Sequence, residues 1–212
     1  MTVGEKRMIV GHLKGYKLWK NKLAQRFKRR RFGKMMDVLD LSADGRLKIL
    51  EVGCSNGRDA LQFLADGEKY ACWGVDIKTK PIEQDNVTVV QADVASLPFE
   101  DNFFDVVITI GLLEHIEPME SLACAIAELA RVGKHQLSVV PSISTLIEPH
   151  SGKFRLPLRL QKERIAAEGG QSPLCLNFLS EHTWTKFAGF ADCKVKRFYY
   201  LFPFIKNTLI YK

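Results

Sequence analysis

A pair of glycines preceded by an acidic residue is the most informative feature of this 212-residue sequence. Glu51 is followed by Gly53 and Gly57, and the segment comes directly after an apolar run. Glycine lets a backbone turn tightly and pass close to a ligand. The amides of such a loop, with the N-terminus of a following helix, form a polar cradle. The segment therefore predicts a loop that binds a nucleotide-like ligand at the end of a strand.

The spacing of this loop excludes two common kinds of nucleotide site. A dinucleotide loop needs Gly-x-Gly-x-x-Gly, but Ser55 and Arg58 stand where the second and third glycines would be. A phosphate-binding loop of the Gly-x-x-x-x-Gly-Lys-Ser/Thr type does not occur in the sequence either.

Two further acidic residues follow apolar runs. Asp76 comes after the run 71–75, and Asp93 comes after the run 87–91. A carboxylate at the end of the second strand can accept both ribose hydroxyls. A carboxylate at the end of the third strand can accept a hydrogen bond from the exocyclic amine of adenine. Together with the glycine loop, the two acids predict a ligand that contains adenosine.

The elements that carry these residues alternate between strands and helices. Strands with nearly continuous apolar residues, separated by helical patterns, are typical of a doubly wound parallel α/β sheet. Two late strand-like runs are too close together for a crossover and predict an antiparallel hairpin. The expected strands cover 47–52, 71–75, 87–91, 104–110, 136–140, 194–200 and 208–211, and the expected helices cover 9–31, 58–65, 119–129 and 180–186.

Two segments fall outside this alternation and suggest the domain organisation. Residues 142–178 are rich in proline and glycine, and so long a stretch is more often a functional lid than a plain loop. Residues 1–40 contain the amphipathic helical pattern of a basic N-terminal arm. We expect this arm to precede a single domain, 41–212, with the lid as an insertion at about 142–178.

The net charge of +7 is concentrated in the arm. Residues 1–40 hold 12 basic and three acidic residues, whereas the rest of the chain holds 19 basic and 21 acidic residues. The overall charge is therefore a poor guide to what the domain binds. For the arm, three readings stay open: a solvated face, contact with an anionic membrane surface or a phosphate-bearing acceptor, or contact with RNA.

Composition and cysteine spacing exclude several other classes of protein. A hydrophobic fraction of 46% excludes a disordered chain. The five cysteines include no Cys-x-x-Cys pair, so we expect no metal site and no redox motif. No apolar run is long enough for a signal peptide or a spanning helix, which predicts a cytoplasmic protein, with peripheral membrane association as the alternative.

The ordered set of motifs resembles the class I S-adenosylmethionine-dependent methyltransferases, in particular the group with quinone-biosynthesis and other small-molecule enzymes. The resemblance rests on the Glu51–Gly57 loop, on Asp76 and Asp93, and on the run LPFEDNFFDVV followed by LEHI, which ends at Ile116. It implies a Rossmann-like, mainly parallel seven-stranded sheet of order 3-2-1-4-5-7-6, with strand 7 antiparallel and helices on both faces. It also implies S-adenosylmethionine as cofactor. The cofactor motifs together with the predicted lid at about 142–178 favour a small, lipid-linked or saccharide-like methyl acceptor.

The same resemblance implies roles for individual residues. The loop from Gly53 to Gly57 would contact the methionine half of the cofactor, and Asp76 would hold the ribose. Asp93, with the backbone of Val94, would hold adenine. Ser55 departs from the more usual glycine. The implied cofactor residues are Glu51, Gly53, Cys54, Ser55, Asn56, Gly57, Asp76, Ile77, Asp93, Val94 and Ile110.

Residues that act on the acceptor must follow the fourth and fifth strands. His115, Glu148 and His150 are candidates for a catalytic base, because a hydroxyl or acidic carbon acceptor has to lose a proton. Glu148, His150 and Arg155 are candidates for acceptor binding, since an arginine suits an anionic group. The alternative roles are structural hydrogen bonding for His115 and ordinary surface exposure for Arg155.

Two other functions remain as alternatives. An RNA-directed methyltransferase would use the basic arm, but base-amine methyltransferases resemble one another in an Asn/Asp-Pro-Pro-aromatic turn after the fourth strand. This sequence has Gly111-Leu112-Leu113 there instead. A non-catalytic cofactor-binding protein is the third reading, although the motif residues are intact.

Overall fold

The structure is a computed structural model, in which the chain forms two compact units, Met1–Asp37 and Val38–Lys212. The sheet and the candidate site belong to the second unit. The predicted helices over 9–31 and 58–65, and nearly all of the predicted lid, lie outside the described residues. The structure describes residues 32–33, 36–39, 41, 46–55, 69–79, 81–84, 87–142, 177, 179–201 and 205–212.

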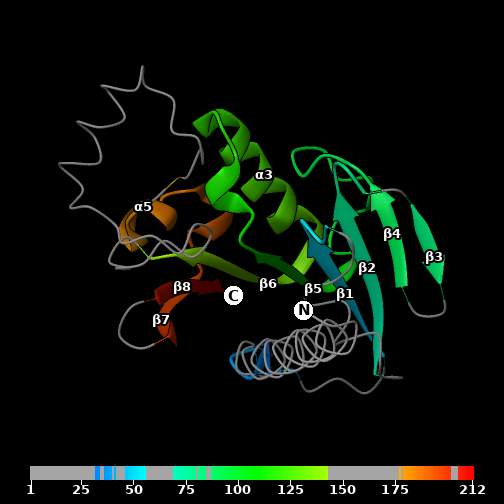
Figure 1. The fold of residues 1–212 in the computed structure, drawn as a ribbon, viewed down its shortest axis with the longest axis horizontal. Helices are drawn as coiled ribbons and strands as arrows, with labels where there is room; N and C mark the ends of the chain where they lie inside the picture. The colour runs from blue at the N-terminus through cyan, green and yellow to red at the C-terminus, as the bar shows by residue number, and fades with distance from the viewer. Residues whose placement is uncertain are drawn as a thin grey trace, which may run out of the picture. The chain divides into compact units, whose positions relative to one another are not determined.

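The second unit contains one eight-stranded sheet, with strand order β3-β4-β2-β1-β5-β6-β8-β7 (Figure 1). Strands β4, β2, β1, β5 and β6 are mutually parallel, β8 pairs antiparallel with β6, and β7 pairs antiparallel with β8. The strands are β1 (Leu47–Val52), β2 (Tyr70–Asp76), β3 (Ile82–Gln84), β4 (Val87–Gln91), β5 (Phe104–Ile110), β6 (Gly133–Pro141), β7 (Lys194–Leu201) and β8 (Ile205–Tyr211).

The predicted sheet is confirmed. Without the short edge strand β3, the order is the expected 3-2-1-4-5-7-6, and the last strand of the chain is the antiparallel one. The bounds of β1, β4 and β5 are those predicted, because each is a compact run of apolar and β-branched residues. Strand β3 was not predicted, since three residues carry no measurable periodicity.

The described helices are short, apart from one. They are η1 (Leu113–His115), α3 (Met119–Val132), α5 (Glu181–Trp184) and η2 (Ala188–Phe190). The predicted helix from Ser180 to Lys186 is wrong in length, although its N-cap is confirmed: the Ser180 hydroxyl accepts a hydrogen bond of 3.1 Å from the N–H of Thr183. The helix stops because Phe187 is extended, with ψ 133°.

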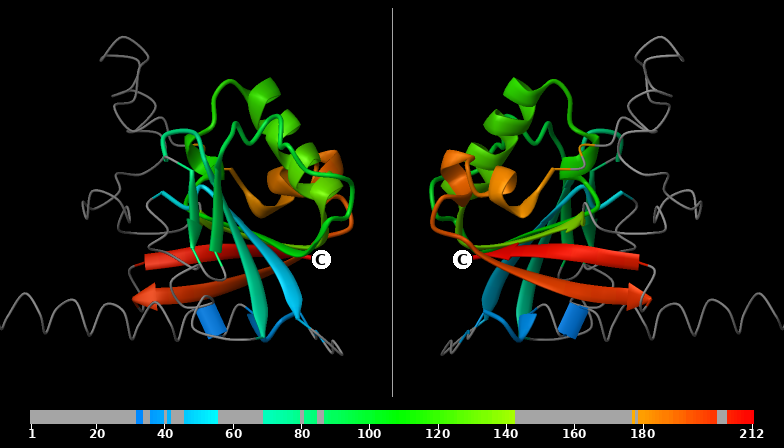
Figure 2. Two further views of the ribbon diagram at one scale, coloured as in Figure 1. Left: turned by 90° about the vertical axis from the view of Figure 1, so that its right-hand side faces the viewer. Right: turned by 90° about the vertical axis from the view of Figure 1, so that its left-hand side faces the viewer.

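Helix α3 and the α5–η2 segment cover the same side of the sheet (Figure 2). Leu122, Ile126 and Leu129 of α3 pack in a buried cluster with residues of β1, β5 and β6 and with Trp184 and Phe190. Helix α3 is amphipathic: its apolar residues recur at helical spacing, so they form one face that packs on the sheet. Within the described ranges, no helix is both long and apolar enough to cross a membrane.

Arg131, in the last turn of α3, fixes the connection between β4 and β5. Its guanidinium donates to the carbonyls of Phe99 (2.7 Å) and Leu97 (3.0 Å), and pairs through two nitrogens with the carboxylate of Glu128. Glu128 in turn accepts a 2.7 Å hydrogen bond from the N–H of Leu97. This connection has no helix, so charge-assisted hydrogen bonds from α3 replace helical packing there.

We expect Arg131→Leu to lower the free energy of unfolding by about 2–3 kcal/mol, because two backbone carbonyls and the carboxylates of Glu128 and Asp101 lose a charged donor. Urea denaturation measures this change. The matched control is Arg197→Leu, which breaks an exposed bidentate pair with Glu181 and should cost less than about 1 kcal/mol. Equal losses in the two variants would contradict the role of Arg131.

The pair of Arg131 and Glu128 should make the stability of the protein sensitive to acid. The hydrogen bond from Arg131 holds the pKa of Glu128 below its ordinary value, against the opposing effect of burial. A lowered folded pKa stabilises the protein above the unfolded pKa, and this stability is lost as the pH falls through the folded pKa. Unfolding free energies measured from pH 6 downwards should therefore fall less steeply for Glu128→Gln than for the wild type. Parallel curves would contradict the prediction.

Candidate cofactor site

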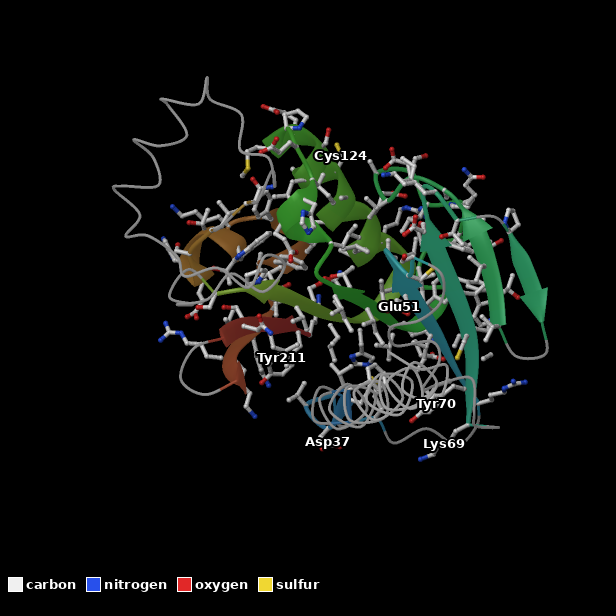
Figure 3. All side chains as sticks on the ribbon, in the orientation of Figure 1. Asp37, Glu51, Lys69, Tyr70, Cys124 and Tyr211 are labelled. Atoms are coloured by element: carbon white, nitrogen blue, oxygen red, sulfur yellow. The ribbon has the colours of Figure 1, made fainter. Side chains whose placement is uncertain are left out.

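The carboxyl ends of β1, β2 and β4 meet at one edge of the sheet. The strands are parallel neighbours in register, with Val52 opposite Val75 and Asp76 opposite Gln91. The segments that follow them therefore lie side by side, as the sequence predicts for a site at a strand edge. Glu51, next to last in β1, is buried near the middle of the sheet (Figure 3).

The first turn after β1 is tied to β2. The carbonyl of Val75 accepts hydrogen bonds from the N–H groups of both Gly53 (2.8 Å) and Cys54 (3.1 Å). Gly53 has φ +79°, and a Cβ added to it would lie 3.1–3.2 Å from three side-chain carbons of Leu112. Both the backbone conformation and the neighbouring leucine therefore require glycine at this position.

Ser55 continues the turn in a conformation that serine rarely adopts. Its φ is +50°, in the left-handed region. Its N–H donates a 2.9 Å hydrogen bond to Oδ2 of Asp76, and its carbonyl accepts a hydrogen bond from the hydroxyl of Thr79. Thr79 was missed by sequence reasoning, because a threonine three residues after a strand end has no distinctive signature.

The carboxylate of Asp76 faces the turn and keeps unused acceptor capacity. Its Oδ1 accepts a 2.9 Å hydrogen bond from the N–H of Lys78, and its Oδ2 accepts the one from Ser55. A carboxylate has about four lone-pair positions, so about two are left for a ligand. Beside it, Ile77 is 58% exposed, although large apolar side chains usually pack away from water.

Asp93 begins a tight turn after β4. Its Oδ1 accepts a 2.9 Å hydrogen bond from the N–H of Ala95, and its carbonyl accepts one of 3.0 Å from Ser96. The Asp93 side chain is exposed, while Val94 is half-buried and packs against the main core. The acid is thus oriented by its own turn, at the same sheet edge as Asp76.

The segment after β5 covers the glycine turn. Ile110 ends the strand half-buried, and Gly111 (φ +67°) donates a 3.1 Å hydrogen bond to the carbonyl of Val139 on β6. Leu112 then lies over Gly53. In η1, Glu114 is fully buried and His115 is exposed.

Asn177, near the end of the predicted lid, is hydrogen-bonded to η1. Its N–H donates to the carbonyl of Glu114 and its Nδ2 donates to the carbonyl of Ile116, both at 2.6 Å. These two bonds join the returning chain to the segment that lies over the glycine turn. Sequence reasoning did not single out Asn177, because its partners are backbone atoms.

The described residues do not cover every predicted site residue. Five of them lie outside the described ranges, and their roles stay predictions: Asn56, Gly57, Glu148, His150 and Arg155. Among the described residues there is no cluster of His, Cys, Asp and Glu that could hold a metal ion.

The cysteines of the described chain have no arrangement suited to chemistry. Cys54 is buried in the turn with its Sγ 3.7 Å from the carbonyl of Ser55. Burial raises the pKa of the Cys72 thiol, also behind the site, to about 11, so this thiol stays neutral at physiological pH. Cys124 is exposed on α3 (Figure 3).

The described edge suits an adenosine-containing ligand. It offers a tight glycine turn at Gly53, a carboxylate with unused acceptor positions at Asp76, and an exposed apolar side chain at Ile77. These correspond to close backbone approach, hydroxyl recognition and contact with an aromatic base.

Comparison with known sequences identifies the central part of the chain. Residues 50–137 match the family model described as "Methyltransferase domain". An uncharacterized protein of Haemophilus influenzae is 33% identical over 100 residues, which cover 41% of this chain and 38% of that protein. The match thus spans well under half of that relative's length.

Comparison with solved structures gives the same fold. A methyltransferase structure from Methanosarcina mazei has a TM-score of 0.53 at 15% identity, covering 80% of this chain and 92% of its own. A Burkholderia thailandensis 1,6-didemethyltoxoflavin N1-methyltransferase, solved with S-adenosylhomocysteine, has a TM-score of 0.56 at 14% identity, covering 97% and 84%. A Synechocystis magnesium protoporphyrin IX methyltransferase, also with S-adenosylhomocysteine, has a TM-score of 0.54 at 16% identity, covering 100% and 86%.

The methyltransferase domain matched by residues 50–137 and the strand order of the sheet agree with each other and with the motif residues. The sheet therefore has the Rossmann-like methyltransferase fold, and residues 50–137 within it resemble a methyltransferase domain.

Proposed function

We propose that this protein transfers the methyl group of S-adenosylmethionine to a small-molecule acceptor. The observation that carries the proposal is the Gly53–Ser55 turn, whose N–H groups bind Val75 and the Asp76 carboxylate and so bring that carboxylate to the glycine loop. The cofactor would supply an activated methyl group, and the protein would supply alignment and exclusion of water.

In this proposal, each described site residue binds a different part of the cofactor. The remaining acceptor positions of Asp76 would bind the ribose hydroxyls, and Ile77 would contact one face of adenine. Asp93 would accept from the adenine amine. The backbone of Gly53 would lie against the methionine half, with Ile110 at the end of β5 close to the reacting methyl group.

On the acceptor side, we propose His115 as the base for an acceptor that must lose a proton. It is exposed in η1, shortly after the end of β5, and histidine is the side chain that most often acts as a general base. Glu148 and His150 remain sequence candidates for the same role, and Arg155 for binding an anionic group on the acceptor.

The acceptor class is a further proposal: a lipid-linked or saccharide-like small molecule. Support comes from the Gly111-Leu112-Leu113 segment, where base-amine methyltransferases have a proline-rich aromatic turn. The solved relatives include enzymes named for didemethyltoxoflavin and magnesium protoporphyrin IX, both small molecules. An acceptor screen that detects S-adenosylhomocysteine formation should include RNA, since methylation of RNA alone would favour the RNA alternative.

We expect Asp76→Ala to weaken S-adenosylhomocysteine binding by about 10- to 100-fold, because a charged acceptor of ribose hydroxyls is lost. Isothermal titration calorimetry measures this. The control is Asp192→Ala. It removes an 82% exposed carboxylate whose ion pair with Lys212, at 3.7 Å, is not part of the proposed site, so binding should stay unchanged. Retained affinity in Asp76→Ala would contradict the cofactor assignment.

Gly53→Ala should also weaken S-adenosylhomocysteine binding, since a Cβ meets Leu112 and an L-residue at this positive φ costs about 1–2 kcal/mol. Adding Leu112→Ala should recover only the steric part of the loss. Gly33→Ala is the control, because a Cβ there meets nothing within 4 Å. Full recovery in the double variant would show that the backbone conformation of Gly53 is not required.

A further inference from the structure

We infer that Thr79 is a positioning residue for the cofactor, which holds Ser55 in the left-handed conformation that the binding turn needs. The inference rests on the proposed function, because it concerns the same cofactor loop. It assigns a role to a residue outside the motif, and it explains how serine can replace the more usual glycine at position 55.

Ser55 is in an unfavourable conformation for its residue type. Only two non-glycine residues of the described chain have positive φ, Ser55 at +50° and Asn102 at +56°. Asparagine tolerates this region well and is common in turns. Serine lacks that tolerance, so the surroundings of Ser55 must stabilise its conformation.

The stabilising contacts hold the residue from both sides. The Asp76 carboxylate accepts from the N–H of Ser55, and the Thr79 hydroxyl donates to the carbonyl of Ser55. Both partners come from the segment directly after β2. One side chain thus fixes the peptide group before the Cα of Ser55, and the other fixes the peptide group after it.

Thr79 is well suited to this role. It is only 7% exposed, and a β-branched side chain has few χ1 rotamers. Its hydroxyl is therefore oriented in advance, so little side-chain conformational entropy is lost when it binds the carbonyl. The neighbouring residue Lys78 differs from Thr79: its side chain is exposed, and its backbone N–H donates to Asp76.

Without the Thr79 hydroxyl, Ser55 gains by relaxing to a right-handed or extended conformation. That change rotates its N–H away from Oδ2 of Asp76 and leaves the carboxylate less well oriented. Cofactor binding then has to restore the turn, and the cost appears as lost affinity. Glycine at position 55 would reach the left-handed region at little cost, so the dependence on Thr79 should disappear.

The test is a double-variant cycle with S-adenosylhomocysteine as the probe, measured by isothermal titration calorimetry, with thermal unfolding of each variant alongside. Thr79→Val should weaken binding about fivefold in the wild-type background, the effect of one typical hydrogen bond. In the Ser55→Gly background, the same substitution should weaken binding by less than about twofold. Thr79→Ser keeps the hydroxyl and should restore most of the affinity.

Thr185→Val is the matched control. It removes a hydroxyl that donates at 3.1 Å to the backbone carbonyl of His182, on α5. Affinity for S-adenosylhomocysteine should not change, although the unfolding temperature can fall. This separates loss of a threonine-to-carbonyl bond in general from its loss in the binding turn.

The outcomes distinguish this inference from the proposed function. Equal weakening by Thr79→Val in the serine and glycine backgrounds would overturn the inference and leave the cofactor assignment intact. So would a lower unfolding temperature with unchanged affinity, because Thr79 would then be only structural. A wild-type chain that does not bind S-adenosylhomocysteine would overturn both.

Discussion

The double hydrogen bond to the carbonyl of Val75 is the interaction on which the rest of the site depends. Gly53 and Cys54 both donate to it, at 2.8 and 3.1 Å, directly after the last paired residue of β1. The hydrogen-bond ladder between β1 and β2 is thereby extended into the turn. The turn then bends at Gly53 and Ser55, which both have positive φ. The positions of the Asp76 carboxylate and of Leu112 follow from the path that this turn takes.

Polar side chains hold two described connections near the site, from β2 to β4 and from β4 to β5. In the described part of the link from β2 to β4 there is only the short strand β3, and the Gln91 amide donates at 2.9 Å to the carbonyl of Ile77. In the link from β4 to β5, Arg131 and Glu128 bind three backbone groups. Individual hydrogen bonds with backbone partners are directional, so they fix a loop more precisely than apolar contacts of similar area.

This distinction explains what the sequence predicted and what it did not. Strands such as Phe104–Ile110 were found because a buried β-branched run has a period that can be read without tertiary contacts. Asp76 and Asp93 were found because their place after a strand is itself the signal. Thr79, Arg131 and Asn177 act on carbonyl groups, which every residue carries, so no sequence pattern reveals these partners.

Among the described residues, a series of contacts links Asn177 to the turn at Gly53. Asn177 binds η1 through two backbone carbonyls, and Leu112, which precedes η1, lies over Gly53. A displacement of Asn177 can therefore be transmitted to the cofactor turn through η1 and Leu112. Because the two acceptors in η1 and its C-cap are backbone carbonyls, these bonds do not depend on which side chains stand there, whereas the contact at Gly53 depends on the Leu112 side chain.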